Sequence, residues 1–279
     1  MGQFKVTLRR FRQNKLAFLG AGVIVFIVLV AIFAPFIAPH HYARQVLADR
    51  FLPPSMDYPL GTDHLGRCLF SRIAYGSRIA LMVGVIIVGI QATIGVTLGL
   101  ISGYYGRHID TIIMRSVDIL LAFPALVLAL AIAAILGPGL FNVMVALGVI
   151  GWSDYARLVR GQVLSVKEND YIQAVRATGA SDLRIIFRHI LPNVVAPIIV
   201  LATLGMAGAL LAASALSFLG LGAQPPMPDW GAILADGRGF LRRAPWIATF
   251  PGLAIMFTVL GFNFLGDGLR DALDPRLKT

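Results

Sequence analysis

The sequence predicts an all-α membrane protein with six transmembrane helices. Of its 279 residues, 57% are hydrophobic and only 14% are charged, and the mean hydropathy is +0.79. A soluble domain carries about 25% charged residues. Several apolar runs reach the roughly 20 residues that a helix needs to cross a bilayer. These runs are continuous rather than alternating, which argues against the strands of an outer-membrane barrel.

Six segments meet this requirement, and each is expected to cross the membrane once. They are Leu16–Phe36, Ile79–Ser102, Val117–Leu136, Phe141–Leu158, Val194–Phe218 and Trp246–Leu265. The third and fourth are joined only by Gly137-Pro138-Gly139, a tight turn that predicts a helical hairpin. The fourth is the least apolar, because Trp152, Asp154 and Arg157 lie near its end.

The first segment is predicted to be a retained membrane anchor. It is long for the apolar core of a signal peptide, and Pro35 disrupts the obvious cleavage site. Before it, Phe4, Val6, Leu8 and Phe11 lie among several Lys and Arg residues. This pattern fits either an interfacial helix on the inner leaflet or an unstructured basic tail. We divide the chain into 1–75, with the tail, first helix and periplasmic loop, and 76–279, a core with five helices.

The distribution of positive charge predicts that both termini lie in the cytoplasm. With that orientation, most of the 24 Lys and Arg residues fall in inner segments, as the positive-inside rule requires. The net charge of +10 has the same origin. It therefore indicates a lipid bilayer, and not nucleic acid, as the partner of this basic chain.

The polar stretch Asp170–Asn193 lies between the fourth and fifth spans and is predicted to form two short amphipathic helices on the cytoplasmic side. Asn169 or Asp170 can cap the first helix, and Ser181 or Asp182 can cap the second. Gly179-Ala180 breaks the chain between them. A soluble partner could reach a structured segment in this position.

The second of these helices is expected to place Leu183, Ile186, Phe187 and Ile190 on one face. Pro192 then falls in the first turn of the fifth span, where its missing N–H costs little. Small residues recur in the second span at Gly95, Gly99 and Gly103. This spacing lets helices approach closely, and we expect it to serve packing within the chain rather than a subunit contact.

Several other functions lack the residues that they need. The single cysteine, Cys68, excludes an internal disulfide and a cysteine metal cluster. No lysine stands in a Gly-x-x-x-x-Gly-Lys-Ser/Thr motif, so the chain has no P-loop for ATP. No catalytic Ser/His/Asp or Cys/His spacing is present, and we expect no enzyme activity. His40-His41 and His64 are expected to be solvated, and no metal site or cofactor is predicted.

Ionisable residues are scarce within the predicted spans, where Asp118 and Asp154 lie near the ends. A carrier driven by protons or sodium usually needs buried acids at mid-membrane. An ion-driven secondary carrier is therefore the less favoured alternative. The neutral polar residues Gln91, Ser214 and Asn263 are the candidates for lining a solute pathway.

The polar stretch resembles the cytoplasmic EAA loop of ATP-binding-cassette (ABC) importer permeases. Gln173-Ala174-Val175, Gly179 and Leu191-Pro192 stand at the spacing of that loop. Gln173 replaces the glutamate of the family pattern, and Val175 replaces its second alanine. The spacing supports the shape of the loop, whereas the missing glutamate removes one charged contact.

A second set of motifs sharpens the resemblance and extends it over nearly the whole chain. The motifs are Pro59–Arg67, Ser71-Arg72, Tyr75–Arg78, Trp152–Arg157, His189–Asn193, Ser217–Gly222 and Gly266–Asp271. They resemble the C-type permease subunit of dipeptide, oligopeptide and nickel importers. Relatives usually have aspartate where Cys68 stands.

This resemblance implies a type I ABC importer permease of the bacterial inner membrane, moving di- or oligopeptides. Nickel chelates and glutathione are the alternative solutes. The implied partners are a second homologous permease, two P-loop ATPase subunits that bind ATP and Mg²⁺, and a periplasmic or lipid-anchored solute-binding protein, for which the outer loop Gln224–Trp230 is a candidate contact.

The resemblance also implies that segment 159–192 couples the permease to the ATPases. The residues expected to make this contact lie within this segment. They are Tyr171, Gln173, Ala174, Val175, Arg176, Gly179, Ala180, Asp182, Arg184 and Pro192.

Overall fold

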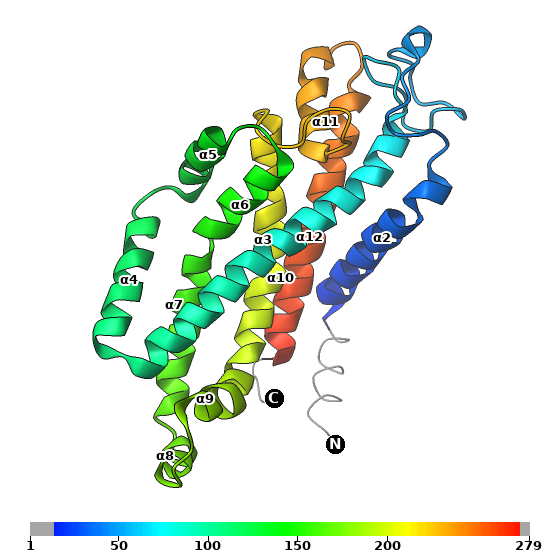
Figure 1. Ribbon diagram of the computed structural model, residues 1–279. Coiled ribbons are helices and arrows are strands. Elements are labelled where there is room, and N and C mark those ends of the chain that lie inside the picture. The colour runs from blue at the N-terminus through cyan, green and yellow to red at the C-terminus, as the bar shows by residue number, and fades with distance from the viewer. Residues whose placement is uncertain (1–13, 274–279) are drawn as a thin grey trace.

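The computed structural model describes residues 14–273 and is helical over most of that range (Figure 1). Its α-helices are α2 (Lys15–Ile37), α3 (Leu69–Tyr105), α4 (Arg107–Leu121), α5 (Ala125–Leu136), α6 (Leu140–Ile150), α7 (Trp152–Lys167), α8 (Asp170–Ala177), α9 (Asp182–Ile185), α10 (Leu191–Phe218), α11 (Trp230–Gly237) and α12 (Trp246–Leu273). Short turns complete the list: η1 (Leu47–Asp49), the π-helical η2 (Ile186–Ile190) and η3 (Arg238–Phe240). The sequence around the predicted interfacial helix, residues 1–13, lies outside the described range.

Four single helices are long and apolar enough to cross a membrane, which confirms the helical membrane fold. They are α2, α3, α12 and the continuous run Asp182–Phe218, which contains α10. These correspond to the first, second, sixth and fifth predicted spans. The division of the chain at residue 75 falls within α3, because that helix begins at Leu69.

The third predicted span, Val117–Leu136, is not one helix. It contains the end of α4 and all of α5, and these two helices meet at 88°. Pro124 has no N–H to continue the ladder and restricts the backbone of Phe123. The fourth predicted span is likewise built from two helices, α6 and α7, which meet at Gly151.

The hairpin predicted between the third and fourth spans is confirmed in the packing of α5 against α6. Gly137 and Gly139 have φ angles of +86° and +158°, which side chains disfavour. The side-chain amide of Asn142 donates to the carbonyls of Leu136 and Gly137, at 3.0 and 2.9 Å. These bonds satisfy carbonyls at the end of α5.

Helix α3 is the central element, and its contact with α7 is the most extensive between any two helices of the described chain. A Cβ atom on Gly95 would lie 2.4 Å from Tyr155 Cβ, and one on Gly99 would lie 2.7 Å from the Ala156 carbonyl oxygen. A Cβ on Gly103 would lie 2.7 Å from Val163 Cβ. The predicted intramolecular role of these glycines is therefore confirmed.

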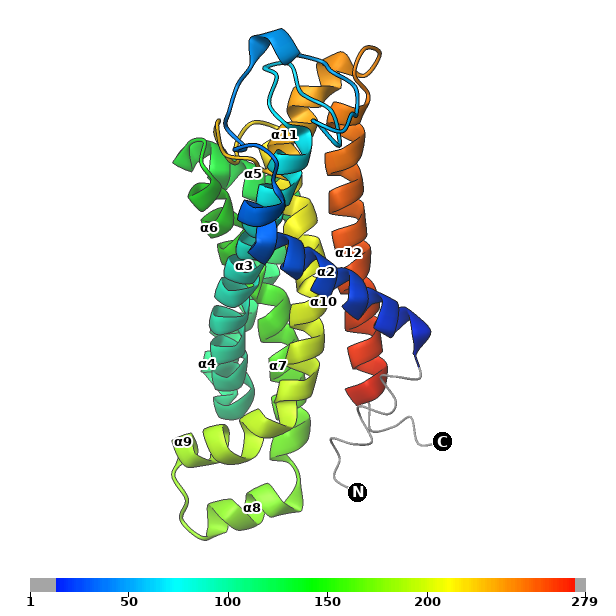
Figure 2. The same cartoon turned by 90° about the vertical axis from the view of Figure 1, so that its right-hand side faces the viewer.

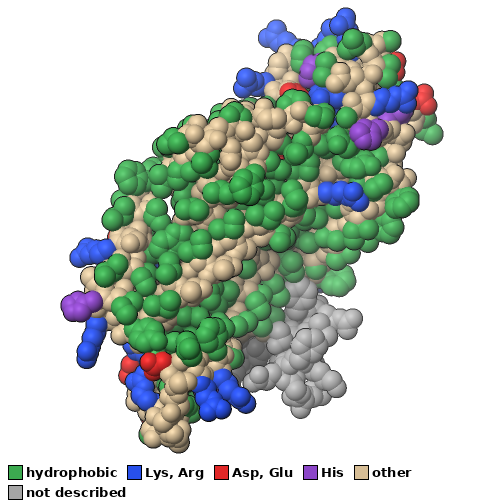
Figure 3. Space-filling view, viewed as in Figure 1, with side chains coloured by type: hydrophobic (Ala, Val, Ile, Leu, Met, Phe, Trp, Pro, Cys, Tyr) green, Lys and Arg blue, Asp and Glu red, His purple; other side chains and the backbone are tan. Residues whose placement is uncertain are grey.

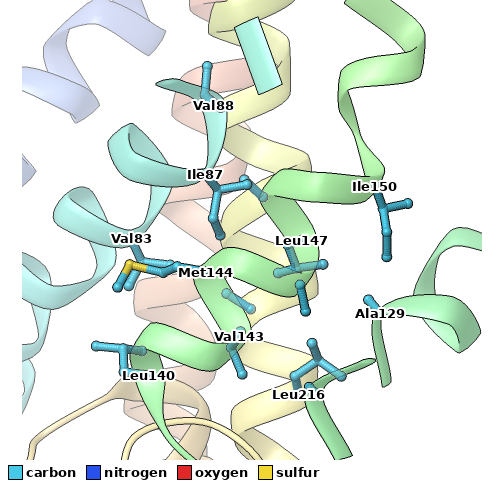
Figure 4. Packing of buried hydrophobic residues seen from close by; sticks show 14 of the residues in the cluster. Val83, Ile87, Val88, Ala129, Leu140, Val143, Met144, Leu147, Ile150 and Leu216 are labelled. Carbon is cyan, nitrogen blue, oxygen red and sulfur yellow. The ribbon is translucent and has the colours of Figure 1, made fainter. Parts of the chain in front are cut away.

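A second part of the core lies nearer the other end of α3, where α5, α6 and α10 converge (Figure 4). Val83 and Ile87 of α3 face Val143 and Leu147 of α6, and Leu216 of α10 closes the cluster. These side chains are at most 9% exposed. The cluster joins the α5–α6 hairpin to the long helices.

Buried charges fix the start of α3 to the loop that precedes it and to α11. Asp63 accepts hydrogen bonds from the backbone of Leu65 and Arg67, at 2.9 and 3.0 Å, and its carboxylate also pairs with the Arg67 side chain. Arg72 Nη1 lies 3.7 Å from the same carboxylate, and Arg67 reaches Asp236 at 3.2 Å. Because a buried charge without a partner is costly, this cluster holds the outer loops in place.

Helix α2 crosses the bundle obliquely against α3 and α12 (Figure 2). Pro35 inside α2 cannot donate to the Ala31 carbonyl. The guanidinium of Arg78 on α3 donates to that carbonyl and to the Ile32 carbonyl, the latter at 3.1 Å. A cation of α3 thus completes the backbone bonding of α2.

The space-filling view shows hydrophobic side chains over the middle of the molecule and most charged side chains toward its two ends (Figure 3). The start of α2 and the end of α12 lie at the same end as α8 and α9 (Figures 1 and 2). We call this the inner end; the loops around Asp63 and α11 form the outer end.

Replacing Gly99 by alanine is expected to destabilise the folded chain, because the added Cβ would collide with the Ala156 carbonyl. Overpacking of this kind costs about 1–3 kcal/mol. Gly89 is the matched control on the same helix, since a Cβ there meets nothing within 4 Å. Thermal unfolding in detergent should show a lower midpoint for Gly99→Ala than for Gly89→Ala. Equal midpoints would refute the close α3–α7 packing.

Candidate coupling surface

The predicted coupling residues gather at the inner end, where α8 and α9 lie across the ends of the long helices (Figure 2). The segment from α7 to the start of α10 is continuous in sequence. It projects beyond the ends of α3 and α12 (Figure 1). A partner approaching from this side would meet α8 first.

Helix α8 forms where the sequence predicts its first loop helix. The extended residue Asn169 precedes it and accepts through its backbone carbonyl from the N–H groups of Ile172 and Gln173, at 3.0 and 3.3 Å. Asp170 in the first turn favours the positive end of the helix dipole. The helix ends before Gly179, whose φ of +80° reverses the chain. The predicted break is confirmed.

The face of α8 that carries Ile172 packs into an apolar cluster at the inner end. Ile172 is 2% exposed and packs with Leu100 of α3, Val163 of α7 and Ile185 of α9. Val175, one turn later, is half-buried against the same cluster. Burial of a side chain such as Ile172 stabilises by about 1.5–3 kcal/mol. A movement of α8 would be transmitted to α7 and, through the shared cluster, to α3.

The second loop helix differs from the prediction in where it ends. The residues Asp182–Phe218 form one continuous helical run, so the loop helix does not end before the fifth span. Pro192 lies in the first turn of α10, as predicted. The run contains the π-helical turn Ile186–Ile190, in which the Leu191 N–H bonds to the Ile186 carbonyl five residues back. The wider turn precedes Pro192, which has no N–H to donate.

The predicted apolar face of this helix is also only partly correct. Ile186 and Ile190 are buried, and Ile185 joins them. Leu183 and Phe187 are 64% and 61% exposed and lie outside the cluster. The apolar face is thus rotated toward Ile185 and away from Leu183 and Phe187.

Two sets of polar contacts join the loop to the long helices, and both use residues that the sequence prediction missed. The Tyr104 hydroxyl at the end of α3 donates to Asp182 at 2.5 Å, and the Arg176 guanidinium lies 5.4 Å from the Tyr104 ring centre. Hydrogen bonding with Tyr104 raises the pKa of Arg176 above its ordinary value. Arg176 and Asp182 thus both contact Tyr104, at the inner end of α3.

The second set links α8 to the start of α10. The side-chain amide of Asn193 donates to the Tyr171 hydroxyl at 3.0 Å and to the His189 carbonyl at 2.6 Å. The carbonyl bond is useful next to the π turn, where regular helix bonding is interrupted. Asn193 belongs to a motif recognised in the sequence, but its contact with Tyr171 spans the break at Gly179 and could not be read from spacing.

The helices that carry the loop are themselves tied together at the inner end. Arg160 of α7 forms a two-pronged ion pair with Asp110 of α4, and Ser102 of α3 donates to the same carboxylate. The Lys167 ammonium donates to the Gly103 carbonyl at 2.9 Å. Two-pronged Arg–carboxylate pairs fix orientation as well as distance. These contacts therefore hold α3, α4 and α7, from which the loop extends, in a fixed arrangement at the inner end.

The remaining predicted coupling residues divide into an exposed set and a packed set. Gln173, Ala174 and Gly179 are exposed, whereas Ala180 is half-buried against the apolar cluster. Arg184 and Pro192 are also exposed. The exposed face of α8 therefore carries a small, uncharged side chain at Ala174, and Arg176 is exposed nearby.

The three predicted pathway residues lie on three different helices. Gln91 on α3 donates to the Leu147 carbonyl of α6 at 3.0 Å, so its amide is used in packing two helices. Ser214 on α10 is 8% exposed and lies at the close approach of Gly231. Asn263 on α12 is half-buried. A pathway role for these residues stays a prediction.

Comparison with known proteins identifies the class to which this helical bundle belongs. Residues 95–279 match the model of the binding-protein-dependent transport system inner membrane component, and residues 2–54 match the N-terminal transmembrane domain of oligopeptide transport permease C. The chain belongs to this family of importer permeases.

Its relatives carry more particular names. The chain is 50% identical to the dipeptide transport system permease protein DppC of Alkalihalophilus pseudofirmus, over 99% of this chain and 91% of that protein. It is 46% identical to the glutathione transport system permease protein GsiD of Pectobacterium atrosepticum, over 97% and 90% of the two chains. The di/tripeptide permease DppC of Pseudomonas aeruginosa is also 46% identical, over 96% and 91%.

The fold also matches a solved structure. A chain of the MetNI methionine ABC transporter, in an inward-facing conformation, superposes with a TM-score of 0.58 at 20% identity. The match covers 72% of this chain and 96% of that chain. The type I permease fold expected from the sequence is thereby confirmed, and the chain is a multi-pass inner-membrane protein.

Gly179 provides a test of how firmly the loop is set. A Cβ there meets no atom within 4 Å, so only its φ of +80° opposes a side chain. Gly179→Val is expected to speed hydrogen exchange of the hydrogen-bonded amides of Ile185 and Ile186 by about tenfold, since this backbone costs L residues about 1–2 kcal/mol. Gly179→Asn should change exchange much less, because asparagine tolerates the conformation. Equal exchange in both variants would contradict the assigned turn.

Proposed function

We propose that this chain is one permease subunit of an ATP-driven importer that takes up short peptides. The observation that carries the proposal is the 50% identity to a dipeptide permease over nearly the whole chain. The chain works with a second homologous permease, two P-loop ATPase subunits and an external solute-binding protein. ATP and Mg²⁺ bind to the ATPase subunits, and this chain itself is non-catalytic.

In this proposal α8 is the coupling element between the permease and the ATPase subunits. The exposed face of α8 around Ala174 enters a groove of the ATPase, and the exposed Arg176 and Arg184 meet acidic groups there. When ATP binding draws the two ATPase subunits together, α8 moves with the groove that holds it. Ile172 passes the movement to α3 and α7, and the Tyr171–Asn193 contact passes it to α10. Alternating access follows as a rigid shift of these packed helices.

Glutathione is the second candidate solute, favoured by the 46% identity to a glutathione permease. It is itself a short peptide, so both candidates share charged amino and carboxylate ends. Nickel chelates and an ion-driven mechanism remain weaker alternatives. Uptake of labelled dipeptide, competed by unlabelled glutathione, distinguishes the two peptide substrates.

Ala174→Arg is expected to uncouple the importer. The reconstituted complex should lose at least about 90% of ATP-dependent dipeptide uptake, because a long cation cannot enter a groove shaped for alanine. Ala174→Ser is the matched control and should retain uptake. Both variants should appear in the membrane at normal levels, since the side chain at 174 is exposed and makes no core contact.

Two results would count against these proposals. Normal uptake by Ala174→Arg would remove α8 as the coupling element. Uptake by the purified chain alone, driven by an ion gradient without ATP, would replace the importer by a secondary carrier.

The orientation, with both termini in the cytoplasm, is tested with single cysteines. Cys68 is buried, and Cys68→Ser supplies a background without thiols. Met56→Cys lies at the outer end, where the native side chain is 98% exposed, and should react with a membrane-impermeant maleimide in intact spheroplasts. Gln173→Cys should react only after permeabilisation. The opposite pattern would invert the proposed topology.

A further inference from the structure

The exposed surfaces of the long helices are of two chemical kinds. Helix α2 exposes large apolar side chains such as Phe18, Phe26 and Phe33, as a lipid-facing helix does. Helix α7 instead exposes Asp154, Arg157, Gly161 and Ser165. These positions recur every three or four residues and so form one stripe along the helix. We call these four residues the charged stripe.

The upper part of the charged stripe lies at the depth of an apolar span. Gly95 and Gly99 of α3 approach Tyr155 and Ala156 of α7, which lie beside Asp154 and Arg157 in sequence. Both glycines fall within the apolar run of α3. The stripe therefore begins within the membrane and runs toward the inner end along α7.

A second helix brings an opposite charge to the same place. Asp118 on α4 lies 3.7 Å from Arg157, and the two side chains are 57% and 59% exposed. Charged side chains at bilayer depth are costly in lipid, and they face protein or water-filled cavities. The surface between α4 and α7 is therefore not a lipid surface.

On its other side the stripe adjoins a hollow. A groove of about 740 Å³ lies between α7, α10 and α12, lined by Leu158 and Gln162 of α7. Asn193 and Arg270 add polar groups to the same groove. The polar side of α7 thus continues from the Asp118 pair into an open depression at the inner end.

We propose that the charged stripe lines the solute pathway and that it receives the charged ends of a zwitterionic peptide. The inference rests on the proposed import of peptides and names a binding surface for them. Arg157 meets the peptide carboxylate, because a guanidinium matches that group with two donors. Asp118 and Asp154 meet the amino group. The exposed Arg157–Asp118 contact opens as the peptide passes and closes behind it.

The first test compares two glycines at which a new side chain meets no atom within 4 Å. These are Gly161 in the charged stripe and Gly22 on the apolar surface of α2. Each becomes cysteine in the Cys68→Ser background, and the assembled complex is treated with a charged methanethiosulfonate, which reacts with the thiolate in water. Gly161→Cys is expected to react at least about tenfold faster than Gly22→Cys. Saturating dipeptide should slow it during turnover.

Two outcomes of this test would overturn the inference. If Gly161→Cys is unreactive in the complex but reactive in the isolated subunit, a partner subunit covers the stripe. If the two cysteines react equally, the stripe is no more hydrated than a lipid-facing surface. Both outcomes leave peptide import by the wild-type complex intact, so they are distinguishable from failure of the proposed function.

The second test separates a solute contact from a structural ion pair. Arg157→Asp and Asp118→Arg should each lower dipeptide uptake by about tenfold, roughly the loss of one hydrogen bond to a charged group. The double variant, with the charges exchanged, re-forms the ion pair and should keep assembly and ATPase activity while uptake stays low. Recovery of uptake to the wild-type rate would show that the pair is only structural and would overturn the proposed contact.

Discussion

The close contact between α3 and α7 is the constraint on which the other inner-end features depend. Three glycines spaced by four residues let two helix backbones approach until there is no room for a single methyl group. In a membrane, association of helices is driven by such packing and not by exclusion of water. The same contact fixes the height of α7, so Arg160 and Lys167 meet their partners on α4 and α3. The direction in which α7 presents its polar side follows from it as well.

Helix α3 then connects the two ends of the subunit. Its outer turn carries Arg72 in the buried ion cluster, and its inner turn carries Tyr104 in the contact with Asp182. Because a helix of this length is stiff along its axis, an event at either end is transmitted as a movement of the whole rod. An importer that senses a delivered solute outside and ATP inside needs such a mechanical connection.

Much of this arrangement could be predicted from the sequence, and the exceptions have physical reasons. The apolar runs, the Gly137-Pro138-Gly139 turn and the break at Gly179 are local signals, and the structure follows them. The hydropathy of a segment does not show where its helix bends, so α4 and α5, which Pro124 separates, are predicted as a single span. Tyr104 and Asn193 were missed because their partners are distant in sequence. The polar residues of α7 were noticed only as a weakness of the fourth span, since their common face emerges once the α3 contact sets the rotation of the helix.

The π turn at Ile186–Ile190 has a consequence for how the loop can vary. This turn accommodates one more residue than a regular α-helical turn does. Loss of one residue here would let the helix close its bonds regularly, and the segments on either side of the turn would keep their relative orientation. Loss of one residue from the regular helix on either side would instead rotate what precedes it by about 100°. The π turn is therefore a position at which the chain can change length while Ile185 stays in the apolar cluster and α8 keeps the same face exposed.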